Sequence, residues 1–260
     1  MEASTQFFTA FEKEPIAQLI PKSLSLMLDQ TPHPLCELAA ADLQHYLLTQ
    51  QDFKHNFGLS ANDQSAIVGK MFGVLVVQTK DGQIGYLAAF SGKLAGRNQH
   101  HKFVPPVFDL LEENSFLHAG MQELTVMTDN IKALEQLKPE DLNQIKLFKA
   151  SRKTHSITLQ KQIFDQYHFL NQSGEEKGLQ ELFSLAGYQN PPAGAGECAA
   201  PKLLQHAFKN GMKPLALAEF WWGLSPKSAH WKHSEFYPCC KEKCEPILAH
   251  MLNGTDLHYQ

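Results

Sequence analysis

Arginine is almost missing from this sequence. Only Arg97 and Arg152 occur among 260 residues, and the formal net charge at pH 7 is −4. Arginine is the preferred partner of phosphate groups, and nucleic-acid-binding domains usually carry a strong basic excess. The composition therefore argues against a freestanding, tight nucleic-acid binder, and any affinity for RNA is expected to be weak and local.

Long apolar runs are missing as well. No stretch approaches the roughly 18–20 apolar residues that a membrane helix needs. The chain does not start with a charged segment followed by an apolar one, which a secretory signal requires. Five cysteines, an odd number, do not indicate a disulfide framework. We therefore expect a cytoplasmic protein with no membrane partner, and a hydrophobic content of 43% is enough for a buried core.

The elements that are present alternate between helix and strand. Residues 34–50 have helical apolar spacing, and residues 70–92 hold two apolar runs around Asp81–Gly82, a strong hairpin turn. Residues 213–223 read as a buried strand between two helices, one starting near 198 and one near 240. This pattern predicts an α/β domain with a mixed sheet and flanking helices, formed by residues 1–114 and 188–260. Residues 115–187 are more polar with helical spacing, which predicts an inserted α-helical hairpin arm.

Three cysteines fall within the six residues 239–244, and a fourth, Cys198, starts the preceding helix. Cysteines four apart on a helix share a face, so Cys240 and Cys244 could bind a metal ion together with Cys198. His233 or His230 could supply a fourth ligand, and zinc is the expected ion. Two alternatives stay open. The thiols could simply pack a helix start, or they could form a redox site, although the sequence has no Cys-x-x-Cys.

Zinc-dependent nucleobase deaminases show the same order of elements. In them a His or Cys ligand and a glutamate begin one helix, and Pro-Cys-x-x-Cys begins another after a strand. Here Ala200 stands where the glutamate is needed, and Cys240 and Cys244 have three residues between them instead of two. These departures predict no deaminase turnover even if zinc binds.

Two further features near the cysteines have both structural and functional interpretations. Glu219 lies in an apolar strand, either paired with a lysine or backbone amides or acting as a site acid with a raised pKa. Trp221 and Trp222, which follow it, can be core residues or can stack a base. The loop after this strand is either a solvated cover or an RNA contact; the residues proposed for that contact are Lys227, Trp231, Lys232, Lys241 and Lys243.

Several segments resemble the N-terminal region of long bacterial pseudouridine synthases of the RluA family. They include "AGAGECAAPKLLQHAF", "KPLALAEFWWGLSPKS", "FYPCCKEKCEPILAHML", "LQKQIFDQYHFLN" and "FSGKLAGRNQHHKFVPPVFDLL". The resemblance runs from about residue 7 to residue 253. The family's catalytic aspartate belongs to a His-Arg-Leu-Asp motif in a separate synthase domain. Here Asn98 follows Arg97 and Lys153 follows Arg152, so no catalytic residue is carried over.

The resemblance implies a non-catalytic accessory domain that positions RNA or protein beside a pseudouridine synthase catalytic domain, in cis or in trans. Because the arginine–aspartate motif is absent, we expect this chain alone to form no pseudouridine; the sequence stops at "NGTDLHYQ", where the family continues towards its catalytic domain. The alternatives are a zinc-binding deaminase-like enzyme or its inactive descendant, and a protein-interaction module that uses the helical arm.

Overall fold

The computed structural model describes residues 6–13, 15, 17–26, 31–60, 65–111, 115–137, 142–227, 230–254 and 257–259. The chain divides into two compact units, one made of residues 1–107 and 168–260 and the other of residues 108–167. Among the described residues, none of the helices combines the length and the apolar character needed to cross a bilayer.

The first unit contains a mixed sheet, as the sequence predicted. Within the described residues seven strands join in the order β1-β4-β3-β7-β2-β9, and β8 also pairs with β7. The strands are β1 (Thr9–Ala10), β2 (Leu24–Leu26), β3 (Lys70–Gln78), β4 (Ile84–Phe90), β7 (Lys213–Trp222), β8 (Phe236–Tyr237) and β9 (Leu257–Tyr259). β3 is antiparallel to both β4 and β7, whereas β2 runs parallel to β7 and β9.

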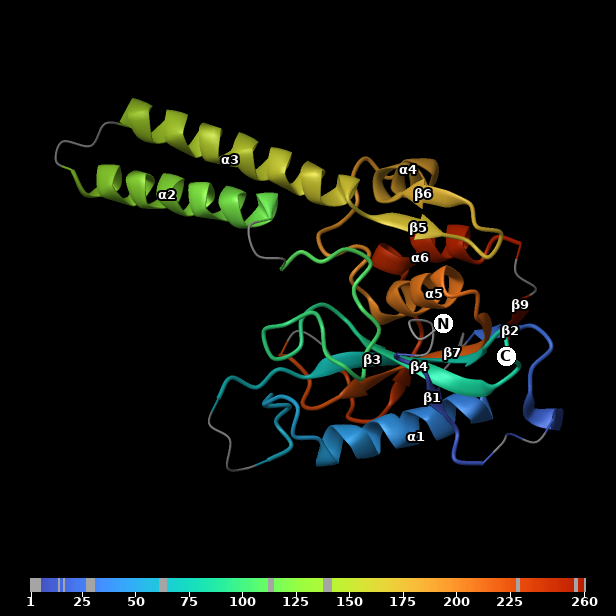
Figure 1. Ribbon diagram of the computed structural model, residues 1–260. Helices are drawn as coiled ribbons and strands as arrows, with labels where there is room; N and C mark the ends of the chain where they lie inside the picture. Colours follow the sequence, from blue (N-terminus) through green and yellow to red (C-terminus); the bar gives the residue numbers. More distant parts are fainter. Residues whose placement is uncertain are drawn as a thin grey trace. The chain divides into compact units, whose positions relative to one another are not determined.

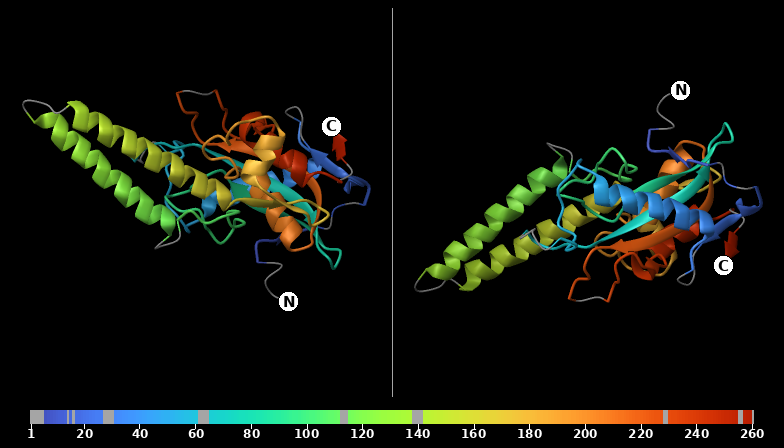
Figure 2. Two further views of the ribbon diagram at one scale, coloured as in Figure 1. Left: turned by 90° about the horizontal axis from the view of Figure 1, so that it is seen from above. Right: turned by 90° about the horizontal axis from the view of Figure 1, so that it is seen from below.

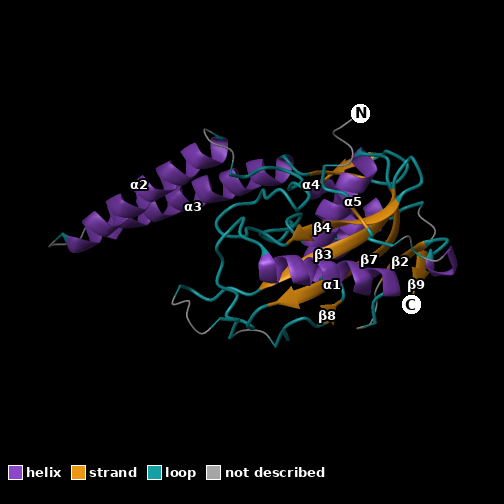
Figure 3. Cartoon of the chain, turned by 60° about the horizontal axis from the view of Figure 1, so that its bottom comes forward, coloured by secondary structure: helices purple, strands orange, loops and turns teal. Residues whose placement is uncertain are grey.

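Helices cover both faces of this sheet (Figure 1). Helix α1 (Pro34–Thr49) lies on one face; α5 (Ala199–Lys209) and α6 (Lys241–Met251) lie on the other, and the view in Figure 3 brings α1 in front of the strands. The unit also contains the 3-10 turn Ala17–Leu19, the short strands β5 (His168–Leu170) and β6 (Glu176–Gly178), and helix α4 (Leu179–Leu185). An α/β architecture with a mixed sheet flanked by helices is thereby confirmed.

The hydrophobic core on the α1 side is rich in aromatic rings. Phe72 of β3 is fully buried, and its ring centroid lies 6.0 Å from that of Phe220 and 5.7 Å from that of Phe103. Leu35, Leu43 and other apolar residues of α1 belong to this core and cover it on the side away from the sheet. Alternate residues of a strand point to opposite faces, so the other set of β3 and β7 side chains faces α5 and α6.

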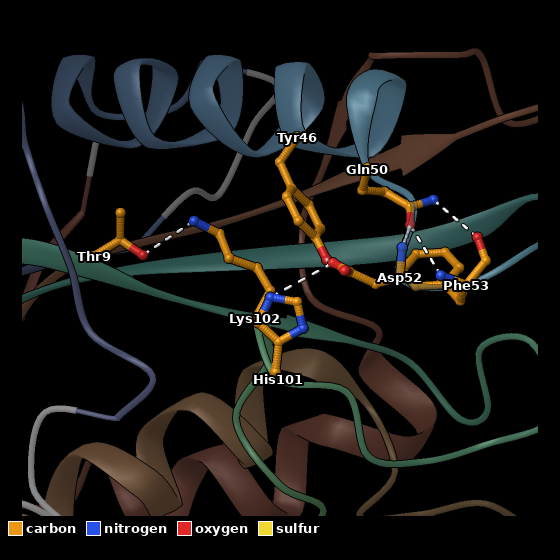
Figure 4. Close-up of polar contacts among 7 residues, drawn as sticks. All are labelled: Thr9, Tyr46, Gln50, Asp52, Phe53, His101 and Lys102. Atoms are coloured by element: carbon orange, nitrogen blue, oxygen red, sulfur yellow. Dashed lines mark hydrogen bonds and ion pairs between the residues drawn. The ribbon is translucent and has the colours of Figure 1, made fainter.

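The carboxyl end of α1 is joined to the rest of the unit by a polar network (Figure 4). The Tyr46 hydroxyl donates to Asp52 Oδ2 over 2.5 Å, and His101 Nε2 lies 3.5 Å from the same oxygen. Lys102 Nζ donates to Thr9 Oγ1 over 3.1 Å and lies over the rings of both Tyr46 and Tyr86. These contacts fasten β1, α1 and the segment after β4 to one another.

The second unit is a pair of helices, α2 (Phe116–Gln136) and α3 (Leu142–Asp165), which pack against each other. The close approach depends on Gly120, where a Cβ would lie 2.7 Å from Leu159. The predicted arm extended to residue 187, but in the structure the unit ends at residue 167. The difference has a physical cause: β5 contacts α5 and α6, and α4 contacts α6, so residues 168–187 pack with the sheet unit. Figure 2 traces both helices in two further views.

Candidate metal centre and adjoining cavity

The start of α5 is held close to the sheet by two contacts. At Gly73 of β3 a Cβ would lie 2.9 Å from the Cβ of Ala199, so only glycine fits without displacing the helix. One turn into α5, the buried Lys202 Nζ donates to the carbonyl oxygens of Phe90, at 2.9 Å, and Gly92, at 3.3 Å. Burial lowers the pKa of Lys202 to about 8. The helix start, with Cys198 as its N-cap residue, is therefore fixed in place.

Three cysteines from the two helix starts converge on one point. Cys198 caps α5, Cys240 caps α6, and Cys244 lies in the first turn of α6. Their sulfur atoms all lie within 4.8 Å of one another, with 3.8 Å between Cys198 and Cys240 and 3.2 Å between Cys240 and Cys244. The predicted convergence of Cys198, Cys240 and Cys244 is confirmed. These three residues are the cysteine cluster below.

The donor set and its spacing suit zinc. Four thiolates at about 2.3 Å around a tetrahedral zinc ion would lie roughly 3.8 Å apart, which falls inside the range of sulfur separations in the cluster. Two of the sulfurs also lie at helix N-termini, where the helix dipole favours negative charge. Three protein ligands leave one position open, which is the pattern of catalytic zinc sites.

Mutual hydrogen bonds shift the pKa values of the three thiols in different directions. Hydrogen bonds from Cys198 and Cys244 lower the pKa of Cys240, although burial opposes this shift. The pKa of Cys198 is raised, first of all by its hydrogen bond with Cys240, and the pKa of Cys244 is raised by its hydrogen bonds with Cys198 and Cys240. A metal ion that displaces the thiol protons would complete a three-thiolate ligand set.

The histidine predicted as a fourth ligand does not join the cluster. His233 Nδ1 accepts the backbone N–H of Gly223 over 3.0 Å, and its ring lies against Trp222 with centroids 4.3 Å apart. Trp222 belongs to the core on the α1 side of the sheet, whereas the cluster lies on the α5 and α6 side. Proximity in sequence suggested His233, but strand alternation places the two groups on opposite faces. His230 is exposed, and neither histidine belongs to the group of mutually close ligand atoms.

Glu219 reaches the start of α5 from the neighbouring strand. It is 4% exposed, and its Oε1 accepts the backbone N–H of Ala200 over 3.1 Å. Burial raises the pKa of Glu219 to about 7, and the charge of Cys240 adds to this rise. Hydrogen bonds from Ala200 and from Cys239 act in the opposite direction. The carboxyl group is thus held beside the cluster with a pKa close to neutrality.

A cavity of about 840 Å³ opens beside Glu219 and Cys240. It lies between β2, the middle of β7, β8 and one side of α6, and its walls are mainly apolar or aromatic. The side chains that line it include Leu26, Leu217, Glu219, Trp231, Tyr237, Cys239, Cys240, Lys241, Leu248 and Leu252. Cys240 and Glu219 therefore connect the cysteine cluster with a space large enough for a small organic ligand.

Of the five residues proposed for RNA contact, Trp231 and Lys241 line this cavity. Trp231 lines it and is half-buried, with its ring stacked on Trp221 at a centroid distance of 5.6 Å. Lys241 also lines the cavity and is exposed, as are Lys227 and Lys232, whereas Lys243 is half-buried. Cys239 was counted in the cysteine-rich segment but was not predicted to line a site, and the apolar wall was not predicted at all. Alternation along β7, which groups Leu217, Glu219 and Trp221 on one face, was the available signal.

Comparisons with known proteins add no relative: no family model, curated protein or solved structure matches this chain. The resemblance to RluA-family synthases therefore stays an expectation from the sequence.

Proposed function

We propose that the domain is a zinc-dependent, deaminase-like hydrolase whose site is the cysteine cluster and the adjoining cavity. The observation that carries the proposal is the position of Glu219. Its carboxyl group accepts the N–H of Ala200, the residue at the place where deaminases carry their proton-transferring glutamate. A strand residue thus brings a carboxyl group to the helix start from which the usual glutamate is missing.

The remaining features support the same function. The hairpin β3–β4, helix α5 with a cysteine at its N-cap, strand β7, and helix α6 with two cysteines follow the deaminase order of elements. Zinc, when bound, would lower the pKa of a coordinated water so that it can attack a ring carbon. Glu219 would hold the proton that this water loses and pass it to the departing amine, so that water is consumed and ammonia is released.

Metal binding is tested with Cys244→Ser, and Cys36→Ser, a buried cysteine on α1 outside the cluster, is the matched control. We expect the wild type and Cys36→Ser to bind zinc, whereas Cys244→Ser loses it. Free zinc at about 100 times its Kd should stabilise a binding protein by about 2.7 kcal/mol. The measurements are zinc content after dialysis and thermal unfolding with and without zinc. Absence of zinc from all three proteins would leave the cysteines with a packing role only.

Turnover is tested with the zinc-loaded wild type and Glu219→Gln. Ammonia release from cytidine and adenosine is measured, and we expect the variant to be slower by a factor of about 10² or more, as for loss of an acid–base group. Zinc binding without ammonia release from either nucleoside would refute the hydrolase proposal for these substrates and would leave the metal a structural role.

A second candidate is the accessory role in RNA pseudouridylation. It is favoured by Lys241, which is exposed and lines the cavity together with Trp231, since lysines neutralise phosphates and aromatic rings stack bases; Lys227 and Lys232 are also exposed. Under this proposal the chain alone forms no pseudouridine on ribosomal or transfer RNA. Detection of pseudouridine after incubation with the purified chain would contradict it.

A further inference from the structure

Contacts between α2 and α3 decide which side of α3 faces its partner helix. The two helices pack side by side in the unit of residues 108–167 (Figure 2). Lys149 Nζ of α3 lies 2.7 Å from Glu135 Oε1 of α2. One and a half turns further on, His155 Nε2 lies 3.2 Å from Glu123 Oε2, and Leu159 is buried against α2. The opposite side of α3 therefore points away from α2.

That opposite side carries an exposed stripe of mainly apolar residues. Its members are Leu147, Ala150, Thr154 and Ile157, which follow one another at intervals of three and four residues and are all exposed. Leu147 is 71% exposed and Ile157 is 57% exposed, although both are large aliphatic residues. Intervals of three and four residues place side chains in one line along a helix and are typical of a seam between two helices. These four residues are the outer stripe below.

Three lysines border the outer stripe: Lys146, Lys153 and Lys161. Each lies four residues from a member of the stripe, so it is a neighbour of that member on the helix surface. Within the described residues, none of the three takes part in an ion pair. The 24 residues of α3 include five lysines and arginines and one aspartate, whereas the whole chain has a net charge of −4. The outer stripe thus lies in a positive region of an otherwise acidic protein.

We infer that the outer stripe docks an amphipathic helix of a partner protein, with aliphatic residues towards the stripe and glutamates or aspartates towards the flanking lysines. In paired helices the apolar seam supplies affinity, and the charges beside the seam choose the partner. A second copy of the same face would bring lysines of like charge together, which is unfavourable. A nucleic acid would use the lysines and leave Leu147 and Ile157 without a contact. The combination of both features therefore fits an acidic helix.

The probe is a synthetic helical peptide of about three heptads, with leucine at the two seam positions and glutamate at the flanking positions. A matched peptide has lysine in place of every flanking glutamate. Like charges on its own flanks keep each peptide from pairing with itself. Binding to the full chain is measured by fluorescence anisotropy at about 50 mM salt, where surface charges are only partly screened. We expect the wild type to bind the glutamate peptide at least about tenfold more tightly than the lysine peptide, and the preference to shrink at high salt.

A charge reversal tests whether the flanking lysines make this choice. Lys146→Glu combined with Lys153→Glu should reverse the preference, because the lysine peptide now meets opposite charges. Lys227→Glu combined with Lys232→Glu is the matched control, since it changes the net charge equally at exposed lysines outside the helical unit. The control should keep the preference of the wild type. A preference that changes equally in both double variants would be an effect of net charge alone and would overturn the inference.

The apolar contact is tested separately with Ile157→Ser, which leaves the charge unchanged. Loss of this buried aliphatic contact should weaken binding of the glutamate peptide by about tenfold. Val126→Ser is the matched control at an exposed aliphatic residue of α2 and should bind as the wild type does. Both substitutions are at exposed positions, and circular dichroism establishes that the helix content is kept. Unchanged affinity in Ile157→Ser, or a wild type that binds neither peptide, would overturn the inference.

Two other results would assign the outer stripe to a different occupant. A dimer seen in analytical ultracentrifugation and lost in Ile157→Ser would identify a second copy of the chain. An oligouridine of about 12 nucleotides that binds more tightly than the glutamate peptide, and is weakened by the Lys146 and Lys153 reversal but not by Ile157→Ser, would identify a nucleic acid. The inference does not involve the cysteine cluster, so the metal-free protein should give the same peptide affinities whether or not the hydrolase proposal holds.

Discussion

The two faces of the central sheet are built from the same strands but hold different kinds of side chain. Towards α1, β3 and β7 present Phe72, Phe220 and Trp222, which belong to one apolar cluster. Towards α5 and α6, β7 presents Glu219 within hydrogen-bonding distance of a helix start, with cysteines and a cavity beside it. The α1 face resembles an ordinary protein core, whereas the other face combines buried apolar residues such as Leu203 and Ile247 with polar and ionisable groups.

The two faces differ in the ionisable groups that they bury, since Glu219 and Lys202 both lie on the side of α5. Burial of Glu219 with its raised pKa costs stability, and apolar packing has to offset this cost because total stability is a small difference between large terms. Gly73 and Lys202 illustrate the arrangement on the other face, since both hold the start of α5 in position against the sheet. Substitutions in the aromatic core on the α1 face should therefore lower the free energy of unfolding. Substitutions at Glu219 or in the cysteine cluster should instead change metal binding and turnover.

The largest effect is expected from Phe72→Ala. The Phe72 ring is fully buried and contacts the rings of Phe57, Phe103 and Phe220, so its removal leaves a cavity that the core cannot fill. We expect a loss of about 3–5 kcal/mol in the free energy of unfolding. Denaturant unfolding gives this value, and zinc content per folded molecule should be unchanged. A loss below about 1 kcal/mol would show that the α1 face is less tightly packed than the structure indicates.

A smaller effect concerns the ionisation of Glu219 in the metal-free protein. The pKa of this carboxyl rises from 4.5 to about 7 on burial, so the folded state holds a proton that the unfolded state has already released between these values. Stability should therefore fall as pH rises from about 4.5 to about 7, by up to about 3 kcal/mol for this group. Below the unfolded pKa both states are protonated, and the penalty is absent.

Glu219→Gln is the control for this pH dependence. The amide does not ionise, so the difference in unfolding free energy between the variant and the wild type should grow in favour of the variant as pH rises through that window. Urea unfolding at a series of pH values measures it. Parallel curves for the two proteins would show that the carboxyl group titrates at its ordinary pKa and would remove the site acid from the proposal.

Most of the sheet's centre could be predicted from the sequence. Asp81–Gly82 lies between two apolar runs, and these became β3 and β4, with Gly82 at a φ of 85°. The strands towards the β9 edge of the sheet could not be predicted from the sequence. β2 is only three residues long and includes the polar Ser25, so it carries no usable periodicity, yet it pairs with both β7 and β9. Short strands are specified by the neighbours they meet, which a linear sequence does not give.

The clustering of three cysteines was predictable from the sequence, whereas the exclusion of His233 and the surroundings of the cluster were not. Two cysteines four apart at a helix start share a face, so Cys240 and Cys244 were expected to act together. The cavity depends on how α6 lies over Leu26 and Leu217, residues nearly 200 positions apart in sequence. No local pattern predicts such a contact. Zinc binding and the role of Glu219 stay predictions.

The smallest effect is expected from Tyr46→Phe, on the α1 side of the sheet. The Tyr46 hydroxyl donates to Asp52 at a partly exposed position (Figure 4), where water replaces a lost partner at little cost. Burial, together with the hydrogen bond and charge of Asp52, raises the pKa of Tyr46, so the hydroxyl stays protonated at neutral pH. We expect a loss of about 1 kcal/mol, seen as a small fall in the melting temperature.

Tyr188→Phe, at an exposed tyrosine packed on Phe183, controls for loss of a hydroxyl group as such. A loss as large as that of Phe72→Ala would mean that the polar network, and not the aromatic core, holds α1 on the sheet. The proposal that the aromatic core supplies the stability of the α1 face would then be wrong.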